Sequence, residues 1–144
     1  MEFTGERYVP TEAGEIRHEH LHRYAWCESF VAGKDVLDIA CGEGYGSAML
    51  AAQARSVVGV DIAQSAVQHA RATYAGVAGL EFRSGDATQI PLDDNSVDVV
   101  ISFETIEHHD RHREMLEEIR RVMRPDGMLI ISSPNRTVYS ALAG

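Results

Sequence analysis

Short apolar runs alternate with amphipathic stretches along this chain. Five runs rich in β-branched and other apolar residues predict buried strands, at residues 35–40, 56–61, 80–84, 97–102 and 128–132. Four stretches are rich in alanine or place apolar residues at helical spacing, at residues 15–32, 47–54, 65–74 and 112–123. Strands that alternate with helices or long crossovers predict an α/β fold with a doubly wound, mostly parallel sheet covered on both faces.

Breaks in this pattern predict one domain with a short arm in front of it. Residues 1–14 are polar and contain Pro10 and two glycines, so we expect an N-terminal arm followed by a single domain at residues 15–144. A Pro-Asp-Gly turn at residues 125–127 is predicted to end the last helix before the fifth strand. A length of 144 residues suits one domain with a real hydrophobic core.

The net charge limits the classes of molecule that we expect the protein to bind. The chain has 13 Lys and Arg against 22 Asp and Glu, and its formal net charge of -9 repels phosphate backbones. We therefore expect no nucleic acid partner, whereas small molecules, glycans and proteins stay open. Two cysteines alone form neither a disulfide framework nor a zinc site. The polar N-terminus and the short apolar runs predict no signal peptide and no membrane span, which favours a cytoplasmic protein.

A glycine-rich loop follows the first predicted strand. It reads Cys-Gly-Glu-Gly-Tyr-Gly at residues 41–46, and we call this segment the glycine loop. Gly42, Gly44 and Gly46 allow sharp turns and let a ligand approach the backbone without meeting a Cβ atom. Because the loop lies between a strand and a helix, a nucleotide site is favoured over a purely structural turn.

Further candidate residues lie at or just beyond other strand ends. They are Asp61, Asp86 and the segment 102–104. Ligands of open α/β sheets bind beyond the carboxyl ends of the strands, so these residues are expected at one site. A carboxylate at Asp61 can accept both hydroxyls of a ribose, or it can cap the next helix. Asp86 can equally form a Gly-Asp turn.

Two nucleotide classes use this layout, and Asp38 discriminates between them. Nicotinamide cofactors carry a pyrophosphate, and their loops read G-x-G-x-x-G/A, whereas this loop reads G-x-G-x-G. An anion at Asp38, just before the loop, repels a pyrophosphate and attracts an ammonium or a sulfonium. The residues therefore favour S-adenosylmethionine (SAM) over NAD. An NAD(P)-dependent oxidoreductase stays as the first alternative.

Five segments together resemble class I SAM-dependent methyltransferases of the type 11 group. Residues 36–46 (VLDIACGEGYG) resemble their first motif, and residues 58–62 (VGVDI) resemble their acidic loop. Residues 84–92 are similar to the segment that brackets adenine, and residues 98–108 are similar to the fourth motif. Residues 116–133 are similar to the unit of the fifth and sixth motifs. The resemblance covers about residues 34–134 and implies the strand order 3-2-1-4-5 and the product S-adenosylhomocysteine.

The resemblance implies a role for each matching residue. The backbone from Ala40 to Gly46 would hold the methionine part, with Asp38 near its ammonium, directly or through water. Asp61 would bind the ribose, while Ile62, Asp86 and the Ala87 N–H would contact adenine. Phe103 and its neighbours 102 and 104 would lie beside the transferable methyl. Ala40 departs from the glycine of many members, and a residue as small as alanine is expected to be tolerated there.

The N-terminal segment carries a narrower resemblance. Residues 4–10 and 19–24 resemble the start of methyltransferases associated with bacterial surface-polysaccharide and glycosyltransferase systems, which makes a sugar hydroxyl the expected methyl acceptor. Arg23 is a candidate partner for the methionine carboxylate, or a solvated helix residue.

The histidines near the fourth strand suggest an optional base. His108 has the pKa range of a general base, and Glu104 would share its face if that stretch is helical. A helix-start or supporting role is the alternative for His108. No histidine cluster supplies a convincing set of ligands, so no metal is expected.

The sequence reaches only about ten residues past the fifth strand. Class I methyltransferases usually continue with two more strands, so this sheet is expected to lack them. Residues 128–132 would then form an exposed apolar edge, which predicts either a chain that is truncated at its C-terminus or a homodimer built through this strand. A non-catalytic nucleotide-binding module that needs a partner chain is the second alternative function.

Overall fold

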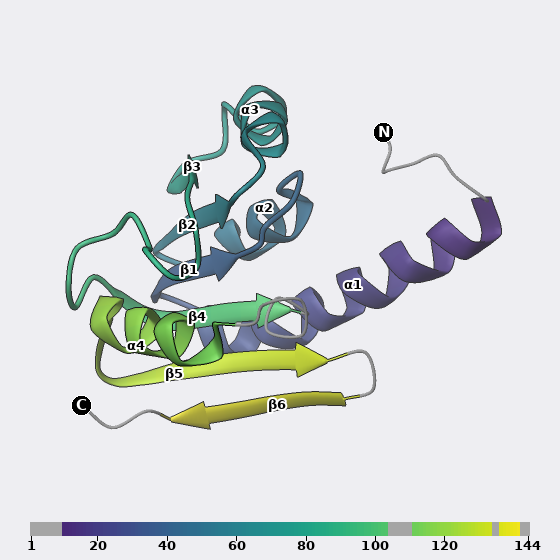
Figure 1. The fold of residues 1–144 in the computed structure, drawn as a ribbon. Coiled ribbons are helices and arrows are strands. Elements are labelled where there is room, and N and C mark those ends of the chain that lie inside the picture. Colours follow the sequence, from purple (N-terminus) through teal and green to yellow (C-terminus); the bar gives the residue numbers. More distant parts are fainter. Residues whose placement is uncertain (1–9, 104–110, 134–135, 142–144) are drawn as a thin grey trace.

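The computed structural model describes the backbone of residues 10–103, 111–133 and 136–141, and the side chains of residues 21–103 and 111–131. Figure 1 shows a single twisted sheet with helices on both sides. In chain order the elements are α1 (Pro10–Val31), β1 (Asp35–Ile39), α2 (Tyr45–Ala51), β2 (Ser56–Asp61), α3 (Gln64–Thr73), β3 (Leu80–Ser84), β4 (Val97–Phe103), α4 (His112–Val122), β5 (Met123–Ser133) and β6 (Arg136–Ala141).

The sheet has the order β3-β2-β1-β4-β5-β6. The first five strands pair in parallel, which confirms the predicted order 3-2-1-4-5 and the α/β class. The second and third predicted strands have the observed bounds, and the first and fourth differ by one residue at one end. Strands buried on both faces need continuous apolar runs, which is why their positions could be read from sequence.

The two faces of the sheet carry separate parts of the core. On one face, α1 and α2 cover β1 and β4 through a cluster that includes Val31, Val36 and Leu50. On the other face, α4 covers β1, β4 and β5 through a cluster that includes Met115 and Ile119. A smaller cluster attaches α3 to the end of the sheet at β3. Both sides of the central strands are therefore excluded from water.

Two element boundaries differ from the sequence predictions by five residues. The first helix begins at Pro10, not at residue 15; proline fits the first turn of a helix because that turn needs no N–H partner. The strand β5 begins at Met123 and includes the turn at residues 125–127. There, Val97 pairs with Met123 and Val99 pairs with Met128, so the turn is accommodated as an irregularity within the strand.

The prediction of an exposed edge at residues 128–132 is wrong. The strand β6 pairs antiparallel along β5 from Met128↔Ala141 to Ser133↔Arg136, as Figure 1 shows at the lower edge of the sheet. Few residues separate β5 from β6 along the chain, and antiparallel pairing needs no long connection. A homodimer built on residues 128–132 would require β6 to leave this edge.

Hydrogen bonds and ion pairs between charged side chains connect the amino ends of the strands, at the opposite end of the sheet from the glycine loop. Asp35 accepts hydrogen bonds from Arg55 at 2.7 Å and from Arg124 at 2.9 Å. Asp98 accepts the Asp35 N–H at 2.9 Å and pairs with Arg124 at 3.0 Å. These contacts connect β1, β4 and β5 with the residue that precedes β2. Within the described ranges, no helix is both long enough and apolar enough to cross a membrane.

Candidate functional site

The glycine loop leaves β1 in a conformation that few side chains tolerate. Ala40, Gly42 and Gly44 have φ angles of 63°, 58° and 94°, all in the left-handed region. The N–H groups of Ala40 and Cys41 both donate to Val60 O, at 2.7 and 3.1 Å, so the start of the loop is held against β2. The φ of Ala40 explains why glycine suits this position, and the alanine present there adopts the strained conformation nonetheless.

Asp61 connects three of the predicted site segments. Its Oδ2 accepts the Gly42 N–H at 2.8 Å, and its Oδ1 accepts the Ala63 N–H at 2.9 Å. Its backbone carbonyl accepts the Gly85 N–H at 3.0 Å, which brings the end of β3 to the same point. The N-cap of α3 is Ala63, without a side-chain capping hydrogen bond, so Asp61 forms a turn just before the helix and is not its cap. A carboxylate has about four acceptor positions, so two remain for a ribose diol.

The surroundings of Asp61 fit the adenosine part of SAM. Ile62, the next residue, is 73% exposed, which is unusual for a large aliphatic side chain and leaves an apolar surface for a base. A Cβ atom placed on Gly42 would meet nothing within 4 Å, so the space beside the loop is open. An acceptor for hydroxyls, an apolar surface and an open backbone segment thus lie together, since the Gly42 N–H is bonded to Asp61 and Ile62 follows Asp61.

The segment after β3 folds into a turn. Asp86 Oδ1 accepts hydrogen bonds from the N–H of Thr88 at 2.8 Å and from its hydroxyl at 2.9 Å, as the turn alternative predicted. Ala87 is buried at 8% exposure and packs in the core cluster under α4. A Cβ atom on Gly85 would lie 2.8 Å from Pro91 Cδ, so only glycine fits there. The contacts of Asp86 and Ala87 with adenine stay a prediction.

Asp38 lies inside the protein, with no exposed surface. Its Oδ2 accepts the Ser47 hydroxyl at 2.6 Å, and the Tyr24 hydroxyl lies 3.2 and 3.1 Å from Oδ1 and Oδ2. Burial raises the pKa of Asp38 to about 7, and the charge of Asp61 adds to the rise, while the hydroxyls of Ser47 and Tyr24 oppose it. The predicted place of Asp38 beside the cofactor ammonium stays a prediction.

Tyr24 of α1 packs onto the end of the glycine loop. A Cβ atom on Gly46 would overlap the Tyr24 ring, so the absence of a side chain at residue 46 makes room for this tyrosine. Phe103, at the end of β4, meets the Tyr24 ring edge to face with centroids 4.9 Å apart, and it is buried at 8% exposure. Burial raises the pKa of the Tyr24 hydroxyl well above its ordinary value, which keeps it a donor.

Sequence reasoning missed two contributors, Tyr24 and Ser47. In the sequence, Tyr24 lies within the first predicted helix and the segment 19–24, and Ser47 begins the second predicted helix, with no role in the site predicted for either. The sequence does contain a signal for these contacts, because glycine at positions 46 and 59 leaves room for the side chains of Tyr24 and Ser47. A Cβ atom on Gly59 would lie 2.9 Å from Ser47 Oγ. Arg23 is half-buried on α1, next to Tyr24, whereas Glu104 and His108 lie outside the described residues.

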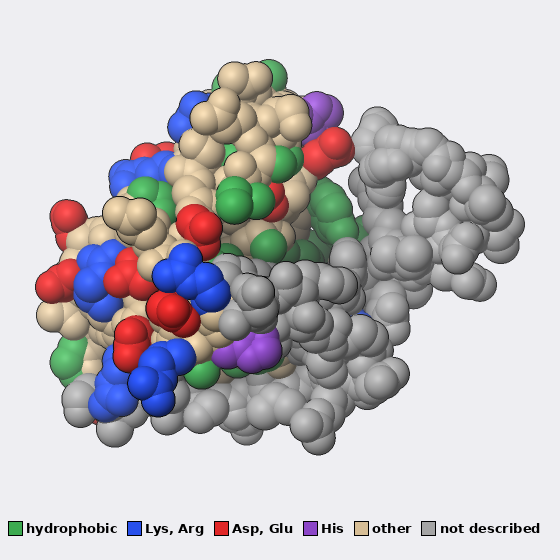
Figure 2. Space-filling model, in the orientation of Figure 1, with side chains coloured by type: hydrophobic (Ala, Val, Ile, Leu, Met, Phe, Trp, Pro, Cys, Tyr) green, Lys and Arg blue, Asp and Glu red, His purple; other side chains and the backbone are tan. Residues whose placement is uncertain are grey.

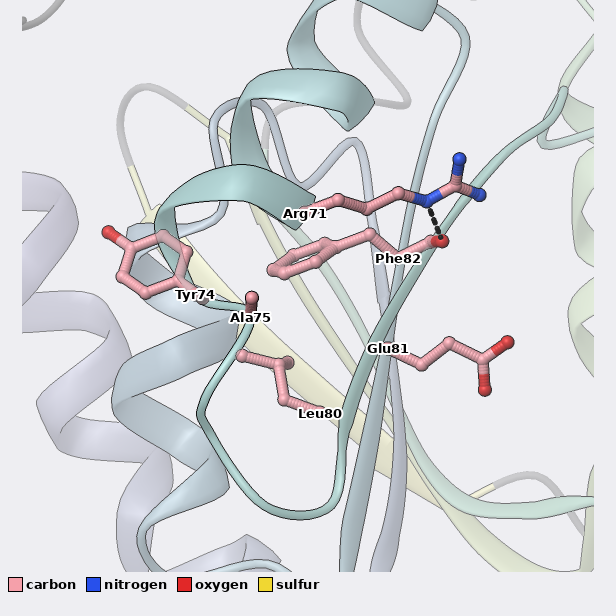
Figure 3. Close-up of a pocket in the computed structure, with 6 residues that line it drawn as sticks. All are labelled: Arg71, Tyr74, Ala75, Leu80, Glu81 and Phe82. Atoms are coloured by element: carbon pink, nitrogen blue, oxygen red, sulfur yellow. Dashed lines mark hydrogen bonds between the residues drawn. The ribbon is translucent and has the colours of Figure 1, made fainter.

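A cavity of about 290 Å³ lies elsewhere in the molecule. Figure 3 shows its lining, which comes from α3 and β3 and the segment between them: Arg71, Tyr74, Ala75, Leu80, Glu81 and Phe82. Arg71 Nε donates to the Phe82 carbonyl at 3.0 Å across it. None of the predicted site residues lines this cavity. A search of the described side chains finds no group of three His, Cys, Asp or Glu that could hold a metal ion.

Comparison with known proteins gives a consistent result. Residues 37–131 match the family model described as a methyltransferase domain. A Mycolicibacterium smegmatis protein named "Probable S-adenosylmethionine-dependent methyltransferase" is 41% identical over 144 residues, 97% of this chain and 54% of that protein. A similarly named Mycobacterium tuberculosis protein is 37% identical over 142 residues, 97% of this chain and 51% of that protein. The chain thus spans about half the length of these curated relatives.

Solved structures show the same fold. A SAM-dependent methyltransferase from Aquifex aeolicus superposes with a TM-score of 0.72 at 24% identity, covering 87% of this chain and 72% of that one. A Haemonchus contortus phosphoethanolamine N-methyltransferase, solved with phosphoethanolamine and S-adenosylhomocysteine, gives a TM-score of 0.66 at 27% identity. It covers 78% of this chain and 26% of that one.

Proposed function

Since the chain belongs to the SAM-dependent methyltransferase family, we propose that the full protein transfers a methyl group from SAM to an oxygen or nitrogen acceptor. The family uses SAM as its methyl donor and releases S-adenosylhomocysteine. When bound, SAM supplies a methyl group already activated by the positive charge of the sulfonium. The work left to the protein is to bind, to align and to exclude water, and alignment alone can contribute about 7–11 kcal/mol.

The observation that carries this proposal is the convergence at Asp61. Its carboxylate holds the Gly42 N–H, and its carbonyl holds the Gly85 N–H, so the ends of three neighbouring strands meet at one half-buried acid. The exposed Ile62 lies directly beside it. We propose that Asp61 takes the ribose hydroxyls, that Ile62 packs on adenine, and that the glycine loop holds the methionine part.

We further propose a sugar hydroxyl of a glycan or small molecule as the acceptor. The support is the resemblance of residues 4–10 and 19–24 to methyltransferases of surface-polysaccharide systems. The charge distribution is consistent with it: Figure 2 shows basic and acidic side chains interleaved over α4, where Arg121 pairs with Glu118 at 2.8 Å and with Asp94 at 2.7 Å. Such a surface offers no continuous basic patch to a phosphate backbone. We propose His108 and Glu104 as the groups that would assist deprotonation of the acceptor.

Calorimetry with three ligands tests the proposal. S-adenosylhomocysteine and SAM are expected to bind, and NADH is not. Asp61→Ala should lower the affinity for S-adenosylhomocysteine at least tenfold, since a charge-assisted pair of hydrogen bonds to the ribose contributes about 1.5–3 kcal/mol. Asp98→Ala is the matched control, because Asp98 also accepts a backbone N–H but lies at the opposite end of the strands.

Three results would count against the proposal. Binding of NADH in place of the adenosyl ligands would favour the oxidoreductase alternative. Unchanged affinity in Asp61→Ala would remove the ribose assignment. Binding of SAM without release of S-adenosylhomocysteine, tested with sugar and amine acceptors on the full-length protein, would favour a non-catalytic module.

A further inference from the structure

We propose that Tyr24, Asp38 and Ser47 form a buried positioning unit that holds the glycine loop in its cofactor-binding shape before the cofactor arrives. The inference rests on the proposed function for the identity of the ligand. It differs from the expectation that Asp38 contacts the cofactor, because in this arrangement the carboxylate acts through the loop.

Asp38 and Ser47 flank the glycine loop. Asp38 lies three residues before residue 41, and Ser47 directly follows residue 46. The Ser47 hydroxyl donates to Asp38 Oδ2 at 2.6 Å, so one short hydrogen bond joins the two ends of the loop. A loop whose ends are tied together has fewer conformations to lose when it binds a ligand.

The helix α1 fixes the same carboxylate from outside the loop. The Tyr24 hydroxyl lies 3.1 Å from Asp38 Oδ2, while its ring lies against Gly46. The ring also meets Tyr45 edge to face, with centroids 6.2 Å apart, and Phe103 of β4. One side chain of α1 therefore contacts the strand before the loop, the last glycine of the loop and the neighbouring strand end.

The unit formed by Tyr24, Asp38 and Ser47 is sealed from water. Asp38 and Ser47 have no exposed surface, and Tyr24 is 6% exposed. Both Asp38 oxygens are within hydrogen-bond distance of hydroxyls of the chain itself. Hydrogen bonds to a carboxylate are strong in such a low-dielectric setting, and no described surface of Asp38 is left for a ligand. Its effect on the cofactor must therefore pass through the loop.

The unit can be tested without ligand by amide hydrogen exchange of the glycine loop. Tyr24→Phe keeps the ring over Gly46 and removes only the hydroxyl, and Ser47→Ala removes the other donor. Both variants are expected to speed exchange of the Gly42 and Gly44 amides about tenfold. Val31→Ala is the matched control: it truncates a buried residue of the same helix and the same core cluster, and it should leave these two amides unchanged.

Calorimetry with S-adenosylhomocysteine then separates positioning from direct contact. Asp38→Asn keeps an acceptor for both hydroxyls but removes the charge, so it should stay within about threefold of the wild-type affinity, whereas Asp38→Ala should lose at least about tenfold. Equal large losses in both variants would mean that the charge itself contacts the ligand, and would overturn the proposal.

The hydrogen-exchange result tests the positioning role of Tyr24, Asp38 and Ser47 even if the protein does not bind S-adenosylhomocysteine. Loop amides that exchange at the wild-type rate in Tyr24→Phe and Ser47→Ala, in folded protein, would overturn the positioning role. The same outcome follows if Val31→Ala accelerates them equally, because the effect would then be general destabilisation. A chain that binds no adenosyl ligand yet shows loop-specific exchange would refute the proposed function and keep the positioning unit.

Discussion

The packing of Tyr24 on Gly46 provides the sharpest prediction about stability. Gly46 is buried at the start of α2, and a Cβ atom there would overlap the Cε and Cζ atoms of the Tyr24 ring. Tyr24 is itself confined by Phe103 on one side and by its hydrogen bonds to Asp38. Gly46→Ala therefore forces either the helix or the ring to move.

Typical free energies show whether the gain in helix propensity or the cost of steric overlap is larger. Alanine in place of a helical glycine gains about 1 kcal/mol from helix propensity. Overpacking a tight core costs about 1–3 kcal/mol, and loss of the charged hydrogen bond from Tyr24 costs about 1.5–3 kcal/mol more. Steric overlap should therefore outweigh propensity, and we expect the free energy of unfolding to fall by about 2–4 kcal/mol.

Urea denaturation of a double-mutant cycle measures this effect. Tyr24→Leu removes the ring atoms that the new Cβ would overlap, so in that background Gly46→Ala should cost nothing or gain about 1 kcal/mol. The coupling energy between the two positions should then be about 3 kcal/mol. Gly76→Ala serves as the control, since a Cβ atom there would meet nothing within 4 Å.

Additive effects would refute this reasoning. If Gly46→Ala costs the same with and without the Tyr24 ring, the loss does not come from their overlap. A Gly46→Ala variant as stable as Gly76→Ala would show that the ring relaxes freely, and would weaken the case for Tyr24 as a fixed part of the loop.

Three further predictions concern single residues. The folded-state pKa of Asp38 is raised to about 7 from 3.8, so the stability that this residue contributes is present below pH 4 and is lost as pH rises through 7. In urea melts, the free energy of unfolding of the wild type relative to Asp38→Asn should therefore fall between these pH values, and a difference that does not change with pH would contradict the prediction. Ala40→Gly should stabilise the chain by about 0.5–1 kcal/mol, because φ at residue 40 is left-handed, and a thermal melt showing destabilisation would oppose this. The Ser102 hydroxyl is the one buried side-chain polar atom without a hydrogen-bond partner in the described part of the chain. Ser102→Ala should therefore leave the free energy of unfolding unchanged or raise it by about 1 kcal/mol. A loss of stability in calorimetric melting would show that the hydroxyl has a partner in solution.

The site was predictable in outline because its residues follow strand ends. The glycine loop, Asp61 and Asp86 could be placed from strand positions alone, since parallel strands bring their carboxyl ends to one edge. The roles of individual side chains were less accessible. The contacts of Asp38 with Tyr24 and Ser47 could not be read from the sequence, because only packing decides which side of a doubly covered strand a polar side chain faces and what it meets there; its place near the cofactor ammonium stays a prediction.

The sequence by itself determined the five parallel strands and most helix positions, because burial on both faces demands continuous apolar runs that are visible locally. Only the tertiary structure decided which side chains meet across elements, such as Tyr24 of α1 with Gly46 of α2. It also decided that β6 covers β5, since the pairing of an edge strand depends on which backbone groups elsewhere are still unpaired. Local pattern specifies elements, and packing between distant residues specifies the site.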